Sequence, residues 1–146
     1  MKKVKSRRLA DRFDFVNFSE VCRNCNNNCC RRFYSVLLPE EEELFESFSD
    51  EVQTPLGIVK TLGSPSRTCP FLDKNGFCRI YKDRPMDCRV WPVIMYYDFK
   101  TNERVIYLDL DCEAVRENRV PVSLINKIVE VLKNTPLDDE WLKSTL

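Results

Sequence analysis

Histidine is absent from the 146 residues of this chain, and glycine occurs only three times. Without histidine there is no imidazole base, no Ser-His-Asp set and no imidazole metal ligand. Three scattered glycines form no phosphate-cradling loop, and Asp109 and Asp111 are as easily read as charges at the edge of a hairpin. Independent catalysis is therefore the function that the sequence favours least.

Net charge is also absent, because Lys and Arg together number 23 and Asp and Glu together number 23. No global field attracts nucleic acid, so we expect no nucleic-acid partner. The chain does open on a basic stretch, and we expect residues 1–12 to form a flexible basic tail. The residues of that stretch are Lys2, Lys3, Lys5, Arg7 and Arg8.

Long apolar runs are missing as well. The most apolar stretch, residues 90–97, stops at Asp98 and is far shorter than the ~18 residues that suggest a membrane span. The apolar run that a signal peptide needs is interrupted by Asp11, Arg12 and Asp14. We therefore expect one domain over residues 1–146, located in the cytoplasm and not in a membrane.

Cysteine, in contrast, is abundant, with eight residues in this short chain. A reducing cytoplasm disfavours four disulfides and makes metal binding the more probable use of the thiols. With no histidine available, thiolates are the only soft ligands, and eight of them suffice for two all-cysteine sites. The candidate ligands are Cys22, Cys25, Cys29, Cys30, Cys69, Cys78, Cys88 and Cys112.

The first four cysteines lie in the segment CRNCNNNCC, residues 22–30. The Cys22-x-x-Cys25 spacing lets one tight turn aim two thiolates at the same ion, and the asparagines favour such turns. Cys29 and Cys30 are adjacent, and neighbouring side chains usually diverge. One of the two is therefore expected to join the cluster, while the other faces a second site or stays a thiol.

The other four, Cys69, Cys78, Cys88 and Cys112, are widely spaced, so any partners they have are tertiary. The alternative is that some are simply small buried apolar residues. Structural zinc sites often pair two Cys-x-x-Cys turns, and this chain has one, which tilts the interpretation toward an iron–sulfur cluster. Cys69 followed by Pro70 also resembles the end of a ferredoxin motif, although the preceding ferredoxin run is missing. Both metals stay open.

Around the cysteines, the pattern predicts an α+β fold: a small irregular metal-stapled domain with a β-hairpin and two or three helices. We expect a strand over residues 33–38, and strands over 90–98 and 104–109 joined as a hairpin. Helices are expected over 39–48, over 124–132 with Ser123 as cap, and over 136–142 with Thr135 as cap. The four glutamates of residues 40–43 suit a helix N-terminus and receive no function. Residues 64–92, with four prolines, are expected to be an irregular loop.

Three parts of the chain carry a resemblance to a known family: CRNCNNNCC, the run CPFLDKNGFCRIYKDRPMDCRVWP of residues 69–92, and Cys112. Together they resemble the YkgJ-type cysteine-cluster family of zinc- or iron-chelating domains. The resemblance covers roughly residues 18–113. It departs from the family at residues 26–28, where three asparagines stand in place of two residues. The family is in turn similar to the cysteine-rich part of flagellin lysine methylases, which implies an iron–sulfur centre and a role in protein modification. The signature residues besides cysteine are Ile80, Tyr81, Arg84, Pro85, Arg89 and Pro92.

Those residues also have structural interpretations. Phe71, Tyr81 and Trp91 are expected to be apolar walls that exclude water from the metal centre. Arg84 and Arg89 are expected to compensate thiolate charge, with binding of an anionic substrate as the alternative.

The favoured function is an iron–sulfur protein, with a 4Fe-4S cluster, that acts in electron transfer or as an accessory to a protein-modification enzyme. The alternative is a zinc-stabilised interaction module without redox activity. Either function implies a protein partner of unknown identity. Among the ligands, Cys22, Cys25, Cys78 and Cys88 are expected to be the most secure, followed by Cys69 and Cys112.

Overall fold

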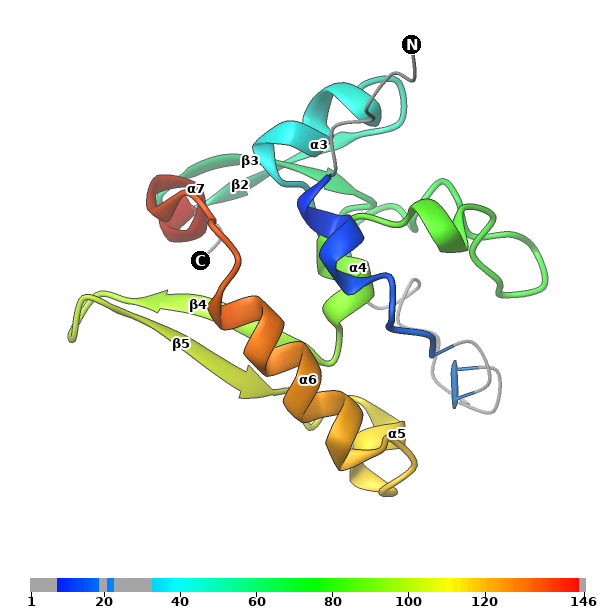
Figure 1. The fold of residues 1–146 in the computed structure, drawn as a ribbon. Coiled ribbons are helices and arrows are strands. Elements are labelled where there is room, and N and C mark those ends of the chain that lie inside the picture. The colour runs from blue at the N-terminus through cyan, green and yellow to red at the C-terminus, as the bar shows by residue number, and fades with distance from the viewer. Residues whose placement is uncertain (1–7, 19–20, 23–32, 145–146) are drawn as a thin grey trace, which may run out of the picture.

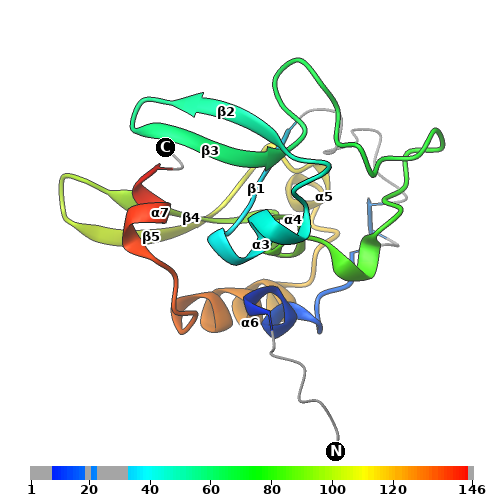
Figure 2. The same cartoon turned by 90° about the horizontal axis from the view of Figure 1, so that it is seen from above.

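The computed structural model describes residues 8–18, 21–22 and 33–144. Two small antiparallel sheets and five α-helices alternate along this part of the chain. Figure 1 shows the hairpin of β4 (Val93–Asp98) and β5 (Glu103–Leu108) on one side of the molecule and the segment of residues 64–84 projecting on the opposite side, and Figure 2 shows the same separation from above. The predicted α+β class with a β-hairpin is confirmed.

The first sheet has three strands in the order β1-β3-β2, with β1 over Ser35–Val36, β2 over Asp50–Thr54 and β3 over Gly57–Leu62. Every second residue of β2 and β3 from Val52 and Val59 onward is buried, as expected for strands with one face on a core. The sequence analysis placed a strand at β1 and missed β2 and β3. The β-branched residues of β2 and β3 favour strands and could have indicated this hairpin.

The second sheet is the predicted hairpin, with β4 over Val93–Asp98 and β5 over Glu103–Leu108. Asn102 adopts a φ of 57° in the connecting turn, a conformation that asparagine tolerates better than most residues. In the register, Val93 pairs with Leu108 and Met95 with Ile106. These two pairs share one face and pack on the larger core.

The longest described helix is α6, Val122–Lys133, which confirms the helix expected from the apolar spacing. Its N-cap residue is Pro121 rather than Ser123. The helix expected over 39–48 is α3, Pro39–Leu44, and the last helix is α7, Asp139–Ser144, which starts later than predicted. Two further short helices, α4 (Met86–Val90) and α5 (Glu113–Arg116), were not predicted.

Two 3-10 helices correct further expectations. The first, η1 (Leu9–Phe13), buries Ala10 and Phe13 completely, so residues 9–12 of the expected tail form a helix that is anchored in the core. The second, η2 (Tyr81–Asp83), together with α4 interrupts the loop that was expected over 64–92. Short helices carry little periodicity, which explains why the sequence pattern missed them.

Two apolar clusters hold the fold together. The large cluster joins η1, α4, the inner face of the hairpin, α5 and α6, with Phe13, Val93, Ile128 and Leu132 among its buried members. The small cluster consists of Leu37, Phe45 and Leu62, against which Cys69, Phe71 and Ile80 pack. Leu37 and the adjacent Leu38 point into different clusters, because neighbouring side chains of extended backbone face opposite sides.

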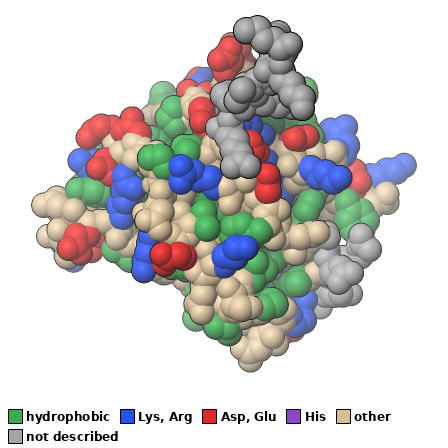
Figure 3. Space-filling view, viewed as in Figure 1, with side chains coloured by type: hydrophobic (Ala, Val, Ile, Leu, Met, Phe, Trp, Pro, Cys, Tyr) green, Lys and Arg blue, Asp and Glu red, His purple; other side chains and the backbone are tan. Residues whose placement is uncertain are grey.

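Lys, Arg, Asp and Glu side chains are interspersed on the face of the molecule seen in Figure 3. Within the described residues, no helix is both long enough and apolar enough to traverse a bilayer.

Candidate metal centre

Cys69 and Cys78 lie at the two ends of a closed loop. Leu72 bridges to Cys78 in an antiparallel sense, and the N–H of Arg79 donates to the carbonyl of Phe71 at 2.8 Å. At the tip of the loop, one carboxylate oxygen of Asp73 accepts the N–H groups of Asn75 and Phe77. These bonds return the chain on itself, so that the two thiols are presented from the base of one hairpin-like turn.

Backbone N–H groups lie beside both sulfurs. Those of Phe71 and Leu72 lower the pKa of Cys69, and that of Ile80 lowers the pKa of Cys78, in each case against the larger effect of burial. Polar backbone groups near sulfur favour a thiolate over a thiol. The N–H of Leu72 donates to the Cys69 carbonyl at 3.1 Å, so the chain turns immediately after this cysteine, as a metal-binding turn requires.

The two sulfurs interact electrostatically. Burial is the main influence that raises the pKa of Cys69 and that of Cys78, and the nearby Cys69 sulfur raises the pKa of Cys78 further. Arg79 acts on both thiols in the opposite direction, with Arg67 beside Cys69 and Arg84 beside Cys78. A metal cation bound by both thiolates would relieve the same repulsion that these arginines only partly offset.

Gly63 lets the end of β3 approach the cysteine loop closely. Its φ is +82°, and a Cβ at this position would meet the backbone nitrogen of Cys69 at 3.1 Å and the carbonyl oxygen of Arg67 at 3.2 Å. Only glycine combines this conformation with so near a neighbour at low cost. The sheet therefore fixes where Cys69 lies.

Arg84 connects the loop to the next cysteine. Cys88 lies in α4, and Arg84 Nη1 donates to the Cys88 carbonyl at 3.0 Å while Arg84 Nε donates to the Tyr81 carbonyl at 2.9 Å. The guanidinium carbon also stacks over the Tyr81 ring, 3.9 Å from its centroid. The expected charge compensation by Arg84 is thus consistent with its place beside Cys78.

Tyr81 also ties down the chain that leads to Cys22. Its hydroxyl accepts the N–H of Phe18 at 2.7 Å, and the N–H of Cys22 donates to the Phe18 carbonyl at 2.7 Å. Cys22 is exposed. Tyr81 therefore acts as a polar anchor through its hydroxyl, and its role as an apolar wall beside the metal stays a prediction.

Cys112 has different surroundings. It is 8% exposed, belongs to the large cluster, and precedes α5 as its N-cap residue. Cys69, Cys78 and Cys112 form no disulfide. The described part of the chain contains no group of three or more Cys, His, Asp or Glu residues arranged to hold a metal ion. Cys25, Cys29 and Cys30 lie outside the described residues.

Arg89 does not compensate the charge of the cysteine thiolates. It is 3% exposed, and Nη1 donates to Asp14 Oδ1 at 2.8 Å and to the Ala10 carbonyl at 3.0 Å, while Nε donates to the Arg84 carbonyl at 2.7 Å. Its charge is paired with carboxylates of the η1 region. In the sequence, Asp11 and Asp14 stand out only as interruptions of an apolar run, so no local pattern indicates this ion pair.

Glu41 is the other buried charge that the sequence analysis missed. Its carboxylate accepts the N–H of Leu38 at 2.9 Å, the N–H of Met86 at 2.9 Å and Arg8 Nη2 at 3.2 Å. Burial raises its pKa, although all three donors act in the opposite direction. Glu41 thus joins α3, α4 and the residue before η1, and the acidic run of residues 40–43 has a structural role beyond a helix terminus.

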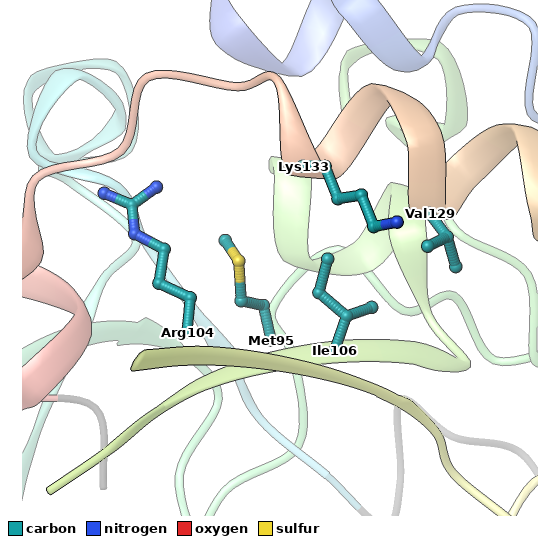
Figure 4. Close-up of a pocket in the computed structure, with 5 residues that line it drawn as sticks. All are labelled: Met95, Arg104, Ile106, Val129 and Lys133. Carbon is teal, nitrogen blue, oxygen red and sulfur yellow. The ribbon is translucent and has the colours of Figure 1, made fainter. Parts of the chain in front are cut away.

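A cavity of about 400 Å³ opens elsewhere, between the hairpin and α6, and no candidate ligand lines it. Figure 4 shows Met95 and Ile106 rising from the hairpin, with Arg104 on one side and Val129 and Lys133 of α6 on the other. The Arg104 guanidinium is held by Asp139 and by the Leu137 carbonyl, both at 2.7 Å from Nη2. The Arg104 cation that lines the cavity therefore anchors the chain before α7.

Comparison with known families gives a match over residues 21–114 to the CxxCxxCC family, described as "Putative zinc- or iron-chelating domain". The chain belongs to this family. The matched region contains all eight cysteines, from Cys22 to Cys112. No curated protein and no solved structure matches the chain.

The geometry fits a metal of the kind that the family chelates. Two soft sulfur donors lie at the base of one loop, close enough to influence each other electrostatically, and nearby backbone N–H groups and arginines lower the cost of their ionisation. Zinc and iron–sulfur clusters both accept such donors.

Proposed function

We propose that this domain is an iron–sulfur protein of the cytoplasm, with a 4Fe-4S cluster, that acts in electron transfer or as an accessory to a protein-modification enzyme. The observation that supports it best is the Cys69–Cys78 pair at the ends of one closed loop, where nearby backbone N–H groups and Arg67, Arg79 and Arg84 favour the thiolate forms. Hydrogen bonds to sulfur and nearby charge are the means by which a protein sets the potential of an iron–sulfur cluster.

In this proposal, Cys69 and Cys78 hold the metal together with further thiolates of the family motif. When bound, the cluster would supply a one-electron redox centre. Phe71 and Ile80, which pack against the small cluster, shield the sulfurs from water on one side, and Arg84 places positive charge beside Cys78. The protein part of the function is therefore to orient the thiolates, stabilise their charge and limit solvent access.

The alternative is a zinc-stabilised interaction module. It is favoured by the thinness of the small cluster, in which only Leu37, Phe45 and Leu62 are buried among the described residues. So little apolar burial does not offset the conformational entropy that is lost when residues 64–84 become ordered. In this alternative, binding of a structural metal supplies the remaining free energy.

Protein purified without oxygen distinguishes the two functions. We expect stoichiometric iron and sulfide and a brown chromophore that bleaches on reduction. Stoichiometric zinc in a colourless, fully folded protein would remove the iron–sulfur proposal and leave the interaction module.

Single Cys-to-Ser variants test the ligand set. We expect Ser at Cys22, Cys25, Cys78 or Cys88 to lower metal content most, with Cys69 and Cys112 next, and Ser at Cys29 or Cys30 singly to leave one centre intact. Parental metal content in the first four variants, combined with its loss on Cys30→Ser, would contradict this assignment.

A further inference from the structure

The two faces of the β4–β5 hairpin are both rich in apolar residues, although only one of them contacts a core cluster. On the outer face, Ile94 pairs with Tyr107 and Tyr96 pairs with Val105, and none of these four residues belongs to either cluster. An antiparallel hairpin with one solvated face normally alternates apolar and polar residues. We call these four residues the outer hairpin face.

Aromatic side chains dominate the outer hairpin face. The rings of Tyr96 and Tyr107 meet edge to face with their centroids 5.6 Å apart, and Tyr107 is 42% exposed. A tyrosine pair of this kind offers a rigid apolar surface with π faces that attract cations.

Carboxylates flank the outer hairpin face at both ends. Asp98 and Glu103 are cross-strand partners at the turn end, and Asp109 and Asp111 follow β5 at the other end. Burial raises the pKa of Tyr107, and Asp109, Tyr96 and Asp111 raise it further. Within the described residues, these four carboxylates form no ion pair with Lys or Arg, and the nearest cation that a hydrogen bond places is Arg116, whose Nη1 donates to the Leu110 carbonyl at 2.8 Å. The tyrosines therefore lie among carboxylates that no ion pair in this part of the chain neutralises.

The hairpin also has an open edge. Helices α4, α6 and α7 contact the hairpin mainly through β4, and in the described part of the chain no third strand joins the sheet at β5. The N–H of Asp109 donates to the Pro92 carbonyl, and pairing alternates from there along the strands, so the backbone N–H groups of Arg104, Ile106 and Leu108 point away from β4. Such an edge can accept a further strand.

Charge determines which strand this edge suits. If β5 paired antiparallel with β5 of a second copy about Ile106, Glu103 of one copy would stand opposite Asp109 of the other. That like-charge contact disfavours self-association. We propose that the β5 edge and the outer hairpin face bind an extended segment of a partner protein in which Lys or Arg residues alternate with aliphatic ones, its cations meeting Glu103, Asp109 and the tyrosine rings.

A synthetic peptide of alternating Lys and Val residues is the probe that tests this surface, with a Glu-Val peptide of equal length as control. In amide NMR spectra of the metal-loaded protein, we expect the Lys-Val peptide to shift the signals of Arg104, Ile106 and Leu108. We expect no shift with the Glu-Val peptide, and weaker binding at higher salt.

Two exposed substitutions locate the contact. Glu103→Lys and Tyr107→Ser should each weaken binding of the Lys-Val peptide by roughly fivefold or more, because each removes one attraction for a cation. Glu43→Lys, an equally exposed change on α3, should leave it unaltered. Signals of α6 report that each variant is folded.

Three results would overturn the proposal: no binding of the Lys-Val peptide, shifts confined to the acidic residues 40–43, or concentration-dependent dimerisation through β5. The readout does not involve the metal. Failure of the iron–sulfur proposal, seen in the metal analysis, is therefore separable from failure of this one.

Discussion

The hairpin side of the molecule and the cysteine-loop side are stabilised in different ways. Among the described residues, the large cluster buries fourteen residues around the hairpin and α6, whereas the small cluster beside Cys69 and Cys78 buries three. Both sheets and α6 have regular hydrogen bonding, while residues 64–84 beside the small cluster have only isolated bridges, turns and the short helix η2. We expect the first side to be stable through its own apolar burial and the second to draw part of its stability from a bound metal.

Removal of the metal should have the largest effect, and it should be confined to the cysteine-loop side. We expect amide hydrogen exchange in residues 64–84 to accelerate by roughly two orders of magnitude or more, because metal-ligand free energy orders this loop. Exchange in α6 and in β4–β5 should change little. Unchanged protection throughout the loop after complete demetallation, measured by mass spectrometry, would show that apolar packing alone holds it.

Leu132→Ala should destabilise the hairpin side and leave metal binding unchanged. Leu132 is 1% exposed in the large cluster, so its truncation should lower the free energy of unfolding by about 3 kcal/mol. Metal content of the folded protein should stay at the parental level. Val122→Ala, at a 69% exposed position of the same helix, is the control and should cost little. Loss of metal from folded Leu132→Ala would mean that the two sides are not energetically distinct.

Glu41→Gln tests the connection between the two sides. An amide cannot accept from Leu38, Met86 and Arg8 with both of its polar atoms, so we expect the variant to be less stable by about 2 kcal/mol in chemical denaturation. Glu43→Gln, exposed on the same helix, should be neutral. Equal stability of the two variants would exclude the buried carboxylate as a connector.

The pH dependence of the same variant has a definite sign. Because burial raises the folded-state pKa of Glu41 above its ordinary 4.5, the folded protein holds the proton more tightly than the unfolded chain does. The stability that this provides is complete below pH 4.5 and is lost as the pH rises through the folded-state pKa. Glu41→Gln should therefore flatten the fall in stability over that interval, measured by denaturation at a series of pH values.

Gly63→Ala should give the smallest effect and the most local one. The added methyl group would crowd the Cys69 nitrogen at a φ of +82°, which should cost about 1 kcal/mol and weaken metal binding. Gly57→Ala is the control, since its φ is also positive, at +148°, while its Cβ would meet open space. Equal metal affinity in the two variants would show that β3 does not position Cys69.

Several elements could be predicted because their signals are local. The hairpin has two β-rich runs around a polar turn, α6 has apolar residues at helical spacing, and the cysteine spacing identifies the family. The sheet formed by β2 and β3 was missed because charged and polar residues such as Asp50, Glu51 and Gln53 obscure its alternation. The partners of Arg89 and Glu41 were missed because they come from distant segments, and no local pattern indicates a tertiary ion pair.

By itself, the sequence determined the α+β class, the presence of the hairpin and α6, and the thiol chemistry, since each of these follows from residue type and spacing over a short stretch. The tertiary structure decided which cysteines lie near each other. Cys69 and Cys78 stand at the two ends of one loop, which closes through Leu72 and which the sheet approaches at Gly63, while Cys112 is buried in the other cluster. Distances between residues far apart in the chain depend on packing, which spacing along a sequence does not encode.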